Sequence, residues 1–271
     1  MTKTASDPAS PDFRVEVPRM PRQWLKAMRH FRRLIANKED TTQVFHITKA
    51  LNGTDLYKHF NRFLADPEGR KRFEERRYLP PILDDRERLR AMPAGSLAHA
   101  YCDFMDREGL TAQGLVDEFN RFIKDGEDTR TEEFRWYNNR SRDTHDMEHV
   151  LTGYGRDALG ETCVLAYSYQ QTSGLGIQFI AWMGATEVKR WAPRGAPVYG
   201  AIREAARRGK AAKAIIYYDI LDLLPRPIEE VREMLGIEPM TVYPEVHRMM
   251  RDAGLDPYEA VGGPVQDAVP A

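Results

Sequence analysis

The chain has little cysteine, almost no net charge and no long apolar run, and each shortage excludes a class of protein. Its 271 residues contain only two cysteines, Cys102 and Cys163, which excludes a disulfide scaffold and a Cys-rich zinc module and fits a reducing compartment. Lys plus Arg number 40 and Asp plus Glu number 41, for a formal net charge of −1. Whole-chain charge therefore does not support a nucleic-acid partner.

No apolar stretch approaches the roughly 18 residues that span a bilayer. The first letters, MTKTASDPASPDF, lack the apolar segment of a secretory signal. We therefore expect a soluble, cytoplasmic protein. No flavin or dinucleotide fingerprint occurs either, because Gly174-x-Gly176 lacks a third glycine and a preceding strand. We interpret those two glycines as close packing at the start of a helix.

The pattern that is present is helical. Asp66-Pro67 predicts a helix start, and Gly109 and Gly236 predict helix ends. Strand-length alternation is scarce: residues 214–218 could form a strand, but their apolar period continues as a helix through Leu224. The expected fold class is all-α, a single multi-helix domain over residues 19–256, with a flexible arm at 1–18 and a flexible tail at 257–271.

One segment, RDTHDMEHVLTGYGRDALGE at 142–161, carries candidate chemistry. His145 and His149 are four residues apart, so on a helix both imidazoles leave the same face, and Asp146 lies at its edge. Two imidazoles and a carboxylate at this spacing can present nitrogen and oxygen donors to one divalent cation.

Glu161 can join this group only if the chain bends. It follows His149 by twelve residues, which is about 18 Å along a straight helix. Gly153 and Gly155 can supply the bend, and Gly160 allows a close backbone approach. We therefore predict a helix, a glycine turn and a returning helix that bring His145, Asp146, His149 and Glu161 together.

Other interpretations of this segment stay open. A histidine pair at this spacing is common by chance, and Asp146 could orient a histidine rather than touch a metal. We expect Glu148 to be a solvated helix residue. A site closed by four ligands could be purely structural.

The motif His145-Asp146-x-x-His149, followed by eleven residues and Glu161, resembles the signature of the Coq-four family of ubiquinone (coenzyme Q) biosynthesis proteins. The sequences MPAGSLAHAYCDFM, RDTHDMEHVLTGYG and LLPRPIEEVREMLGI also look like that family, and the resemblance spans about Leu51 to Tyr243. The chain would be a bacterial member.

The resemblance implies an all-α fold and a metal held by His145, Asp146, His149 and Glu161, most often zinc, with Fe, Mn, Co and Mg as alternatives. It implies an enzyme, a carboxy-lyase that removes the C1 carboxylate of a polyprenylated 4-hydroxybenzoate-type precursor, with or without replacement by hydroxyl. A Lewis acid and a carboxylate suit that chemistry, and Glu161 is our first candidate for a ligand or proton carrier, with Asp146 second. Two histidines and a carboxylate also suit iron.

The partners and location follow from the same resemblance. Family members work with other ubiquinone-biosynthesis enzymes, and a prenylated substrate requires access to a membrane. Residues 22–35 place Trp24, Met28 and Phe31 on one face and basic residues on another, which is typical of an interfacial helix or of a surface helix packed on a core. We expect peripheral contact with the inner face of the cytoplasmic membrane, and a homodimer on base rates.

Two other functions compete with the decarboxylase. The first is a non-catalytic organiser that binds the lipid precursor and has a structural metal. The second is a small metallohydrolase that activates water.

Overall fold

The structure is a computed structural model that describes residues 13–259 except 19, 38–39, 41, 115, 118, 120–130 and 173. Within this part of the chain the fold is all-α, as predicted, and contains no β-strand. Residues 1–12 and 260–271 of the predicted arm and tail lie outside the described residues. The elements are α1 (Trp24–Ala36), α2 (Thr42–Leu51), α3 (Asp55–Ala65), α4 (Pro67–Glu75), α5 (Pro80–Leu83), α6 (Arg86–Arg90), α7 (Leu97–Glu108), α9 (Glu132–Asp143), α10 (His145–Thr152), α11 (Ala158–Tyr169), α12 (Leu175–Trp191), α13 (Val198–Ala211), η1 (Ile215–Tyr217), α14 (Ile220–Leu223), α15 (Ile228–Leu235) and α16 (Val242–Asp252).

Local signals account for several helix boundaries. The Asp66 carboxylate accepts from the backbone of Glu68 and Gly69 at the start of α4. Gly109 and Gly236 end α7 and α15 in the left-handed conformation, with φ of 64° and 67°, which glycine adopts without a Cβ penalty. Within residues 214–218, Ile215–Tyr217 form a short 3₁₀ turn and not a strand.

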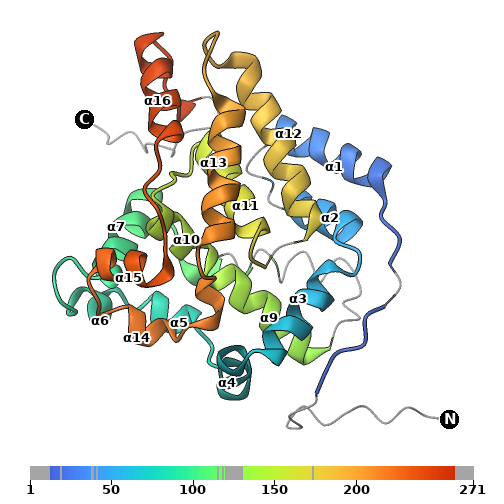
Figure 1. Cartoon of the computed structure of the whole chain (residues 1–271), viewed down its shortest axis with the longest axis vertical. Coiled ribbons are helices and arrows are strands. Elements are labelled where there is room, and N and C mark those ends of the chain that lie inside the picture. Colours follow the sequence, from blue (N-terminus) through green and yellow to red (C-terminus); the bar gives the residue numbers. More distant parts are fainter. Residues whose placement is uncertain are drawn as a thin grey trace, which may run out of the picture.

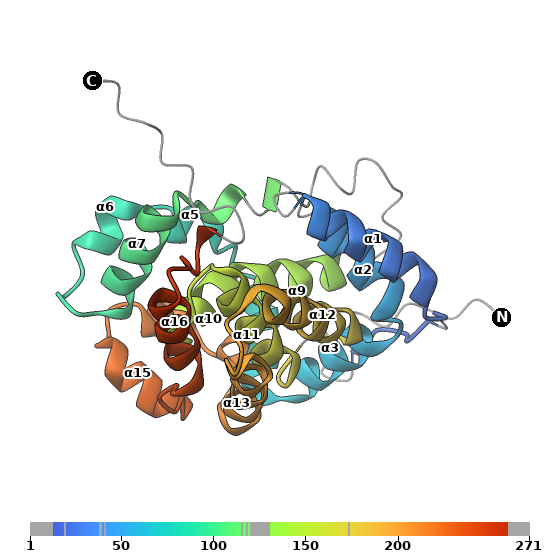
Figure 2. The same cartoon turned by 90° about the horizontal axis from the view of Figure 1, so that it is seen from above.

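The helices surround α10 and α11. Figure 2 shows α6, α7 and α15 at one end of the molecule and α1, α2 and α3 at the other, with α9 to α12 between them. In Figure 1, α11, α12 and α13 run side by side, and α11 packs against both of the others. A cluster of buried apolar side chains combines residues of α7 with Met147, Val150 and Leu151 of α10. The candidate site therefore lies on two central helices.

A buried arginine joins three parts of this core. Arg208 of α13 is 2% exposed. Its Nε donates to the carbonyl of Glu238 at 2.8 Å, and its Nη2 donates to the carbonyl of Thr152, at the end of α10, at 3.1 Å. The guanidinium also lies over the Tyr154 ring. Charge-assisted hydrogen bonds of this kind offset the cost of burying the cation.

The N-terminal part of the chain packs on the same core. Phe13 and Val15 are buried with Phe60 and Phe73. Ala27 and Phe31 of α1 pack against Ile47 and Ile180, whereas Trp24 is 53% exposed and Leu25 is 90% exposed. The apolar face predicted for residues 22–35 is therefore divided between the core and the solvent. Among the described residues, no helix has both the length and the apolar character needed to cross a bilayer.

Candidate metal centre

The predicted glycine turn joins α10 to α11. Gly153 follows α10 with a φ of 80°, a left-handed conformation that favours glycine. At Gly160 a Cβ atom would lie 2.0 Å from the carbonyl oxygen of Gly155, so only glycine fits where the returning helix crosses the turn. The chain therefore reverses within a few residues, and Glu161, in the first turn of α11, returns to the face of α10 that carries the histidines.

Three of the four predicted ligands meet at this face. His145, His149 and Glu161 each offer a donor atom, and the three atoms lie within 4.8 Å of one another. The Oε2 atom of Glu161 is 3.5 Å from His149 Nε2 and 3.9 Å from His145 Nε2. The two imidazole planes are nearly perpendicular, at 84°. Donors this close can converge on one cation after small side-chain movements, because Zn–N distances are about 2.0–2.1 Å.

A hydrogen bond at Nδ1 of His149 determines which ring nitrogen is available to a metal. Its Nδ1–H donates to the carbonyl of Tyr154 at 3.0 Å, so Nε2 carries the lone pair when the imidazole is neutral. Nε2 is buried and makes no hydrogen bond to any residue that the structure describes. A buried nitrogen without a hydrogen bond, facing a carboxylate, fits a cation between the two groups.

The electrostatics of the pair agree with this arrangement. Burial alone would lower the pKa of His149, but the Glu161 carboxylate and the Tyr154 carbonyl outweigh burial and raise that pKa. Burial would likewise raise the pKa of Glu161, and the neighbouring imidazoles, His149 first, lower it well below the ordinary range. Each group therefore stabilises the charged form of the other.

Asp146, the fourth predicted ligand, is not among these three donors. It follows His145 by one position on the same helix, and its carboxylate acts on the two imidazoles through its charge. Burial raises the pKa of Asp146, and the two histidines oppose that shift. Its contribution in this structure is electrostatic, and direct coordination by Asp146 stays a prediction.

Arg156 is a neighbour of the site that the sequence pattern did not single out. Its Nε donates to Glu161 Oε1 at 3.3 Å, and the arginine side chain is 38% exposed. The guanidinium therefore holds the carboxylate oxygen that points away from His149. An arginine five positions before a glutamate gives no sequence signal by itself, because the contact depends on the turn between them.

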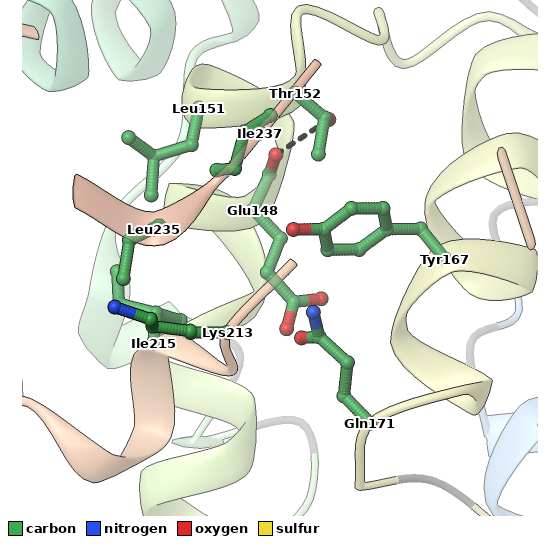
Figure 3. A pocket seen from close by; sticks show the side chains of 9 residues that line it. All are labelled: Glu148, Leu151, Thr152, Tyr167, Gln171, Lys213, Ile215, Leu235 and Ile237. Atoms are coloured by element: carbon green, nitrogen blue, oxygen red, sulfur yellow. Dashed lines mark hydrogen bonds between the residues drawn. The ribbon is translucent and has the colours of Figure 1, made fainter. Parts of the chain in front are cut away.

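The expectation for Glu148 was wrong: its side chain is buried, not solvated. Figure 3 shows its carboxylate beside Tyr167 and Gln171. Burial raises the pKa of Glu148 to about 7. The physical reason is that this part of α10 is covered by Tyr167 of α11 and Gln171, and by residues from later in the chain, Lys213, Ile215, Leu235 and Ile237. Amphipathic spacing could not show this, because the helix has no solvent face at Glu148.

A cavity of about 550 Å³ borders His149. Its volume is within the roughly 300–1,000 Å³ range of small-molecule sites. Phe104 stacks against the His149 ring at a centroid distance of 5.4 Å. The wall combines aromatic and aliphatic side chains with three arginines, and its members include Phe104, Arg107, Tyr154, Ile228, Arg232, Tyr243, His247 and Arg251.

Comparisons with known proteins give a consistent result. The family model described as "Coenzyme Q (ubiquinone) biosynthesis protein Coq4" matches residues 14–241. The mitochondrial ubiquinone biosynthesis protein COQ4 of Paracoccidioides brasiliensis (strain Pb18) is 28% identical over 200 residues, covering 72% of this chain and 65% of the relative. That of Podospora anserina is 28% identical over 202 residues, covering 73% and 62%. The chain thus spans less than two thirds of the length of these relatives.

A solved structure shares the fold. The crystal structure of a protein from Nostoc punctiforme PCC 73102, assigned to ubiquinone biosynthesis, superposes with a TM-score of 0.58 at 21% identity. The match covers 80% of this chain and 100% of that one. At this identity the likeness supports the all-α architecture.

Proposed function

Because this chain belongs to the coenzyme Q (ubiquinone) biosynthesis protein Coq4 family, we propose that it removes the C1 carboxylate of a polyprenylated 4-hydroxybenzoate-type precursor with the help of a divalent metal ion. The observation that carries the proposal is the convergence of His145, His149 and Glu161, with the buried His149 Nε2 left without a hydrogen bond among the described residues. We assign the site to zinc first, because two imidazoles and a carboxylate are usual zinc ligands, with Fe, Mn, Co and Mg as alternatives.

The residues of the site suit this reaction. A divalent cation held there would supply Lewis acidity toward the ring carboxylate. In the simple decarboxylation the bond between C1 and the carboxylate breaks, CO2 leaves, and a proton arrives at C1. We assign Glu161 first as a ligand, because the neighbouring imidazoles hold its pKa well below the ordinary range, and Asp146 as the group that holds or delivers that proton. Arg156, which donates to Glu161 Oε1, keeps this carboxylate in place at the site.

The cavity beside His149 is where we place the aromatic ring. Phe104 and Tyr154 contribute aromatic atoms to its wall. Arg107, Arg232 and Arg251 surround the cavity with positive charge suited to a carboxylate. Arg232 already donates to the carbonyls of Val150 and Leu151, and Arg107 donates to Glu108. We therefore expect exposed Arg251 to be the best placed of the three to meet a ligand.

The proposed location is the inner face of the cytoplasmic membrane, with the protein bound peripherally. Trp24 and Leu25 are exposed at the start of α1, beside Arg29, Arg32 and Arg33, whose side chains are also exposed. Exposed apolar side chains next to basic residues fit the interface of an anionic bilayer.

We further propose contacts with other ubiquinone-biosynthesis enzymes and a homodimer. The membrane contact is tested by flotation of the protein with anionic vesicles. Leu25→Glu should abolish binding to the vesicles while leaving the fold intact.

Decarboxylation is tested directly on the full chain. Metal content is measured first by elemental analysis after gentle purification, and a metal-to-protein ratio near zero would refute the metal site. The metal-loaded protein is then incubated with a short-chain prenyl 4-hydroxybenzoate in the presence and in the absence of oxygen, and the product masses are measured by mass spectrometry. The product mass shows whether hydrogen or hydroxyl replaces the carboxylate.

The controls separate the competing functions. We expect His149→Ala to abolish turnover with an unchanged circular dichroism spectrum, while His99→Ala, a histidine of α7 outside the group of three donors, keeps it. Binding of the analogue without any chemical change would refute the enzyme and favour a lipid-binding organiser. Hydrolysis of generic esters without loss of CO2 would favour a metallohydrolase.

A further inference from the structure

The buried carboxylate of Asp157 lies at the junction of the metal-site turn and the C-terminal helix. Its side chain is 1% exposed. Oδ1 accepts from the backbone N–H groups of Leu159 and Gly160 at 3.1 and 3.2 Å, so Asp157 is the N-cap of α11. The same carboxylate also contacts two side chains of α16, Tyr243 and His247. We refer to Asp157, Tyr243 and His247 as the Asp157 network.

Each contact with α16 is a hydrogen bond to a buried acceptor. The His247 Nε2–H donates to Asp157 Oδ1 at 3.0 Å, and the Tyr243 hydroxyl donates to Asp157 Oδ2. The Tyr243 hydroxyl in turn accepts from the backbone N–H of Gly155 at 3.1 Å. One helix therefore holds both ends of the segment between Gly155 and Asp157.

Backbone contacts tie the position of Glu161 to that of this segment. Its backbone N–H donates to the carbonyl of Asp157 at 2.9 Å, which makes it part of the first turn that Asp157 caps. Gly160 lies directly against the Gly155 carbonyl, so the turn and the helix cannot move independently. A displacement of Asp157 is therefore transmitted to the carboxylate whose Oε2 lies 3.5 Å from His149 Nε2.

We infer that Tyr243 and His247 are positioning residues for Glu161, and that α16 thereby sets the affinity of the metal centre. This inference rests on the proposed function, because it concerns the same three donors. Both side chains lie beyond residue 241, where the family match ends, so the family comparison assigns them nothing. They also line the cavity beside His149. The residues that support the metal site therefore also form part of the wall of the cavity in which we place the aromatic ring.

The alternative is that α16 only stabilises the fold, and the chain offers a matched control for it. Glu204 of α13 accepts from the backbone N–H groups of Thr241 and Val242 and from the Thr241 hydroxyl at the start of α16. Glu204→Gln weakens the docking of the same helix without touching Asp157. A merely structural role predicts that Glu204→Gln and Tyr243→Phe behave alike.

The test uses the full chain and zinc, with affinity measured by competition with a chromophoric chelator. Tyr243→Phe keeps the ring and removes both hydroxyl contacts, and His247→Leu removes the imidazole donor. We expect each to weaken zinc binding about tenfold, the lower end of the range for residues that orient ligands. His247→Gln retains an N–H donor and should recover most of the affinity. Glu204→Gln should lower the melting temperature and leave zinc affinity within about twofold.

A second measurement does not depend on the metal. Amide hydrogen exchange at Gly155 and Gly160 should accelerate in Tyr243→Phe and His247→Leu, and should stay at the wild-type rate in Glu204→Gln.

The outcomes separate the two proposals. The inference would be overturned if the wild-type protein binds zinc and the variants of the Asp157 network bind it equally well. It would also be overturned if the amide hydrogens of these variants exchange as slowly as those of the wild type. Either result would leave the proposed function standing. Equal loss of affinity in Glu204→Gln and Tyr243→Phe would overturn the inference too. Wild-type protein that binds no zinc or other divalent metal would refute both.

Discussion

Replacing Gly160 by alanine tests the tightest contact of the candidate site. The added Cβ would lie 2.0 Å from the Gly155 carbonyl oxygen and 2.7 Å from its carbonyl carbon, whereas ordinary contact begins at 3.4 Å. The returning helix must therefore retreat by about 1.4 Å from backbone that is itself held by Tyr243.

The expected cost follows from that overlap. Overpacking against fixed backbone destabilises by about 3 kcal/mol, and for a chain of this size that lowers the melting temperature by about 6 to 12 °C. The same retreat carries Glu161 away from His149. The 3.5 Å separation of their facing atoms is already about the edge length of a zinc tetrahedron, roughly 3.4 Å, so we also expect zinc affinity to fall by at least about tenfold.

The assay is thermal unfolding by circular dichroism, with zinc content measured on the same samples. Gly200→Ala is the control, because Gly200 of α13 is also helical and its Cβ would meet Val242 Cγ1 at 3.3 Å and Pro197 Cβ at 3.4 Å. Alanine there requires Val242 to move by only a few tenths of an ångström, so it should change the free energy of unfolding by less than about 1 kcal/mol. A Gly160→Ala protein that melts within about 1 °C of the wild type and keeps its zinc would refute the reasoning.

Three further expectations concern pH and metal removal. A chelator should lower the melting temperature of the metal-loaded protein, because the metal binds only the folded arrangement of His145, His149 and Glu161; an unchanged transition would show that the metal is incidental. Zinc should leave as the pH falls below about 6, since ligand histidines must be neutral, and retention of a full equivalent at pH 5 would contradict this ligand set. Burial alone would raise the pKa of Glu204, but hydrogen bonds from Thr241 and Val242 outweigh it and lower the pKa. Its contribution is therefore complete above the ordinary glutamate pKa and is lost as the pH falls through the folded value, so Glu204→Gln should cost most stability near pH 7 and little near pH 2, as urea unfolding would measure.

The sequence predicted those features that depend on neighbouring residues. Asp66-Pro67, Gly109 and Gly236 mark helix ends because capping acts within one turn. The turn between α10 and α11 is equally local: Gly153 adopts a positive φ and Gly160 allows the close crossing. This is why the sequence could place His145, His149 and Glu161 on one site.

Features that depend on distant partners could not be predicted in this way. Tyr243 and His247 lie 86 and 90 positions after Asp157, and nothing in a single sequence pairs them. Glu148 is a polar residue on a helix whose second face is covered by segments far along the chain. The apolar face of α1 is divided for the same reason, since Phe31 meets Ile180 of a distant helix.

The buried guanidinium of Arg208 has a consequence for any shortened version of the chain. Its acceptors come from Thr152 and Glu238, which lie on either side of it in the sequence. A truncation before residue 238 would leave this cation with only one of its two carbonyl acceptors, at a cost of about 1–3 kcal/mol. Residues up to Glu238 are thus part of the minimal folding unit, and a fragment that preserves only the histidine and glutamate motif would not reproduce the intact protein.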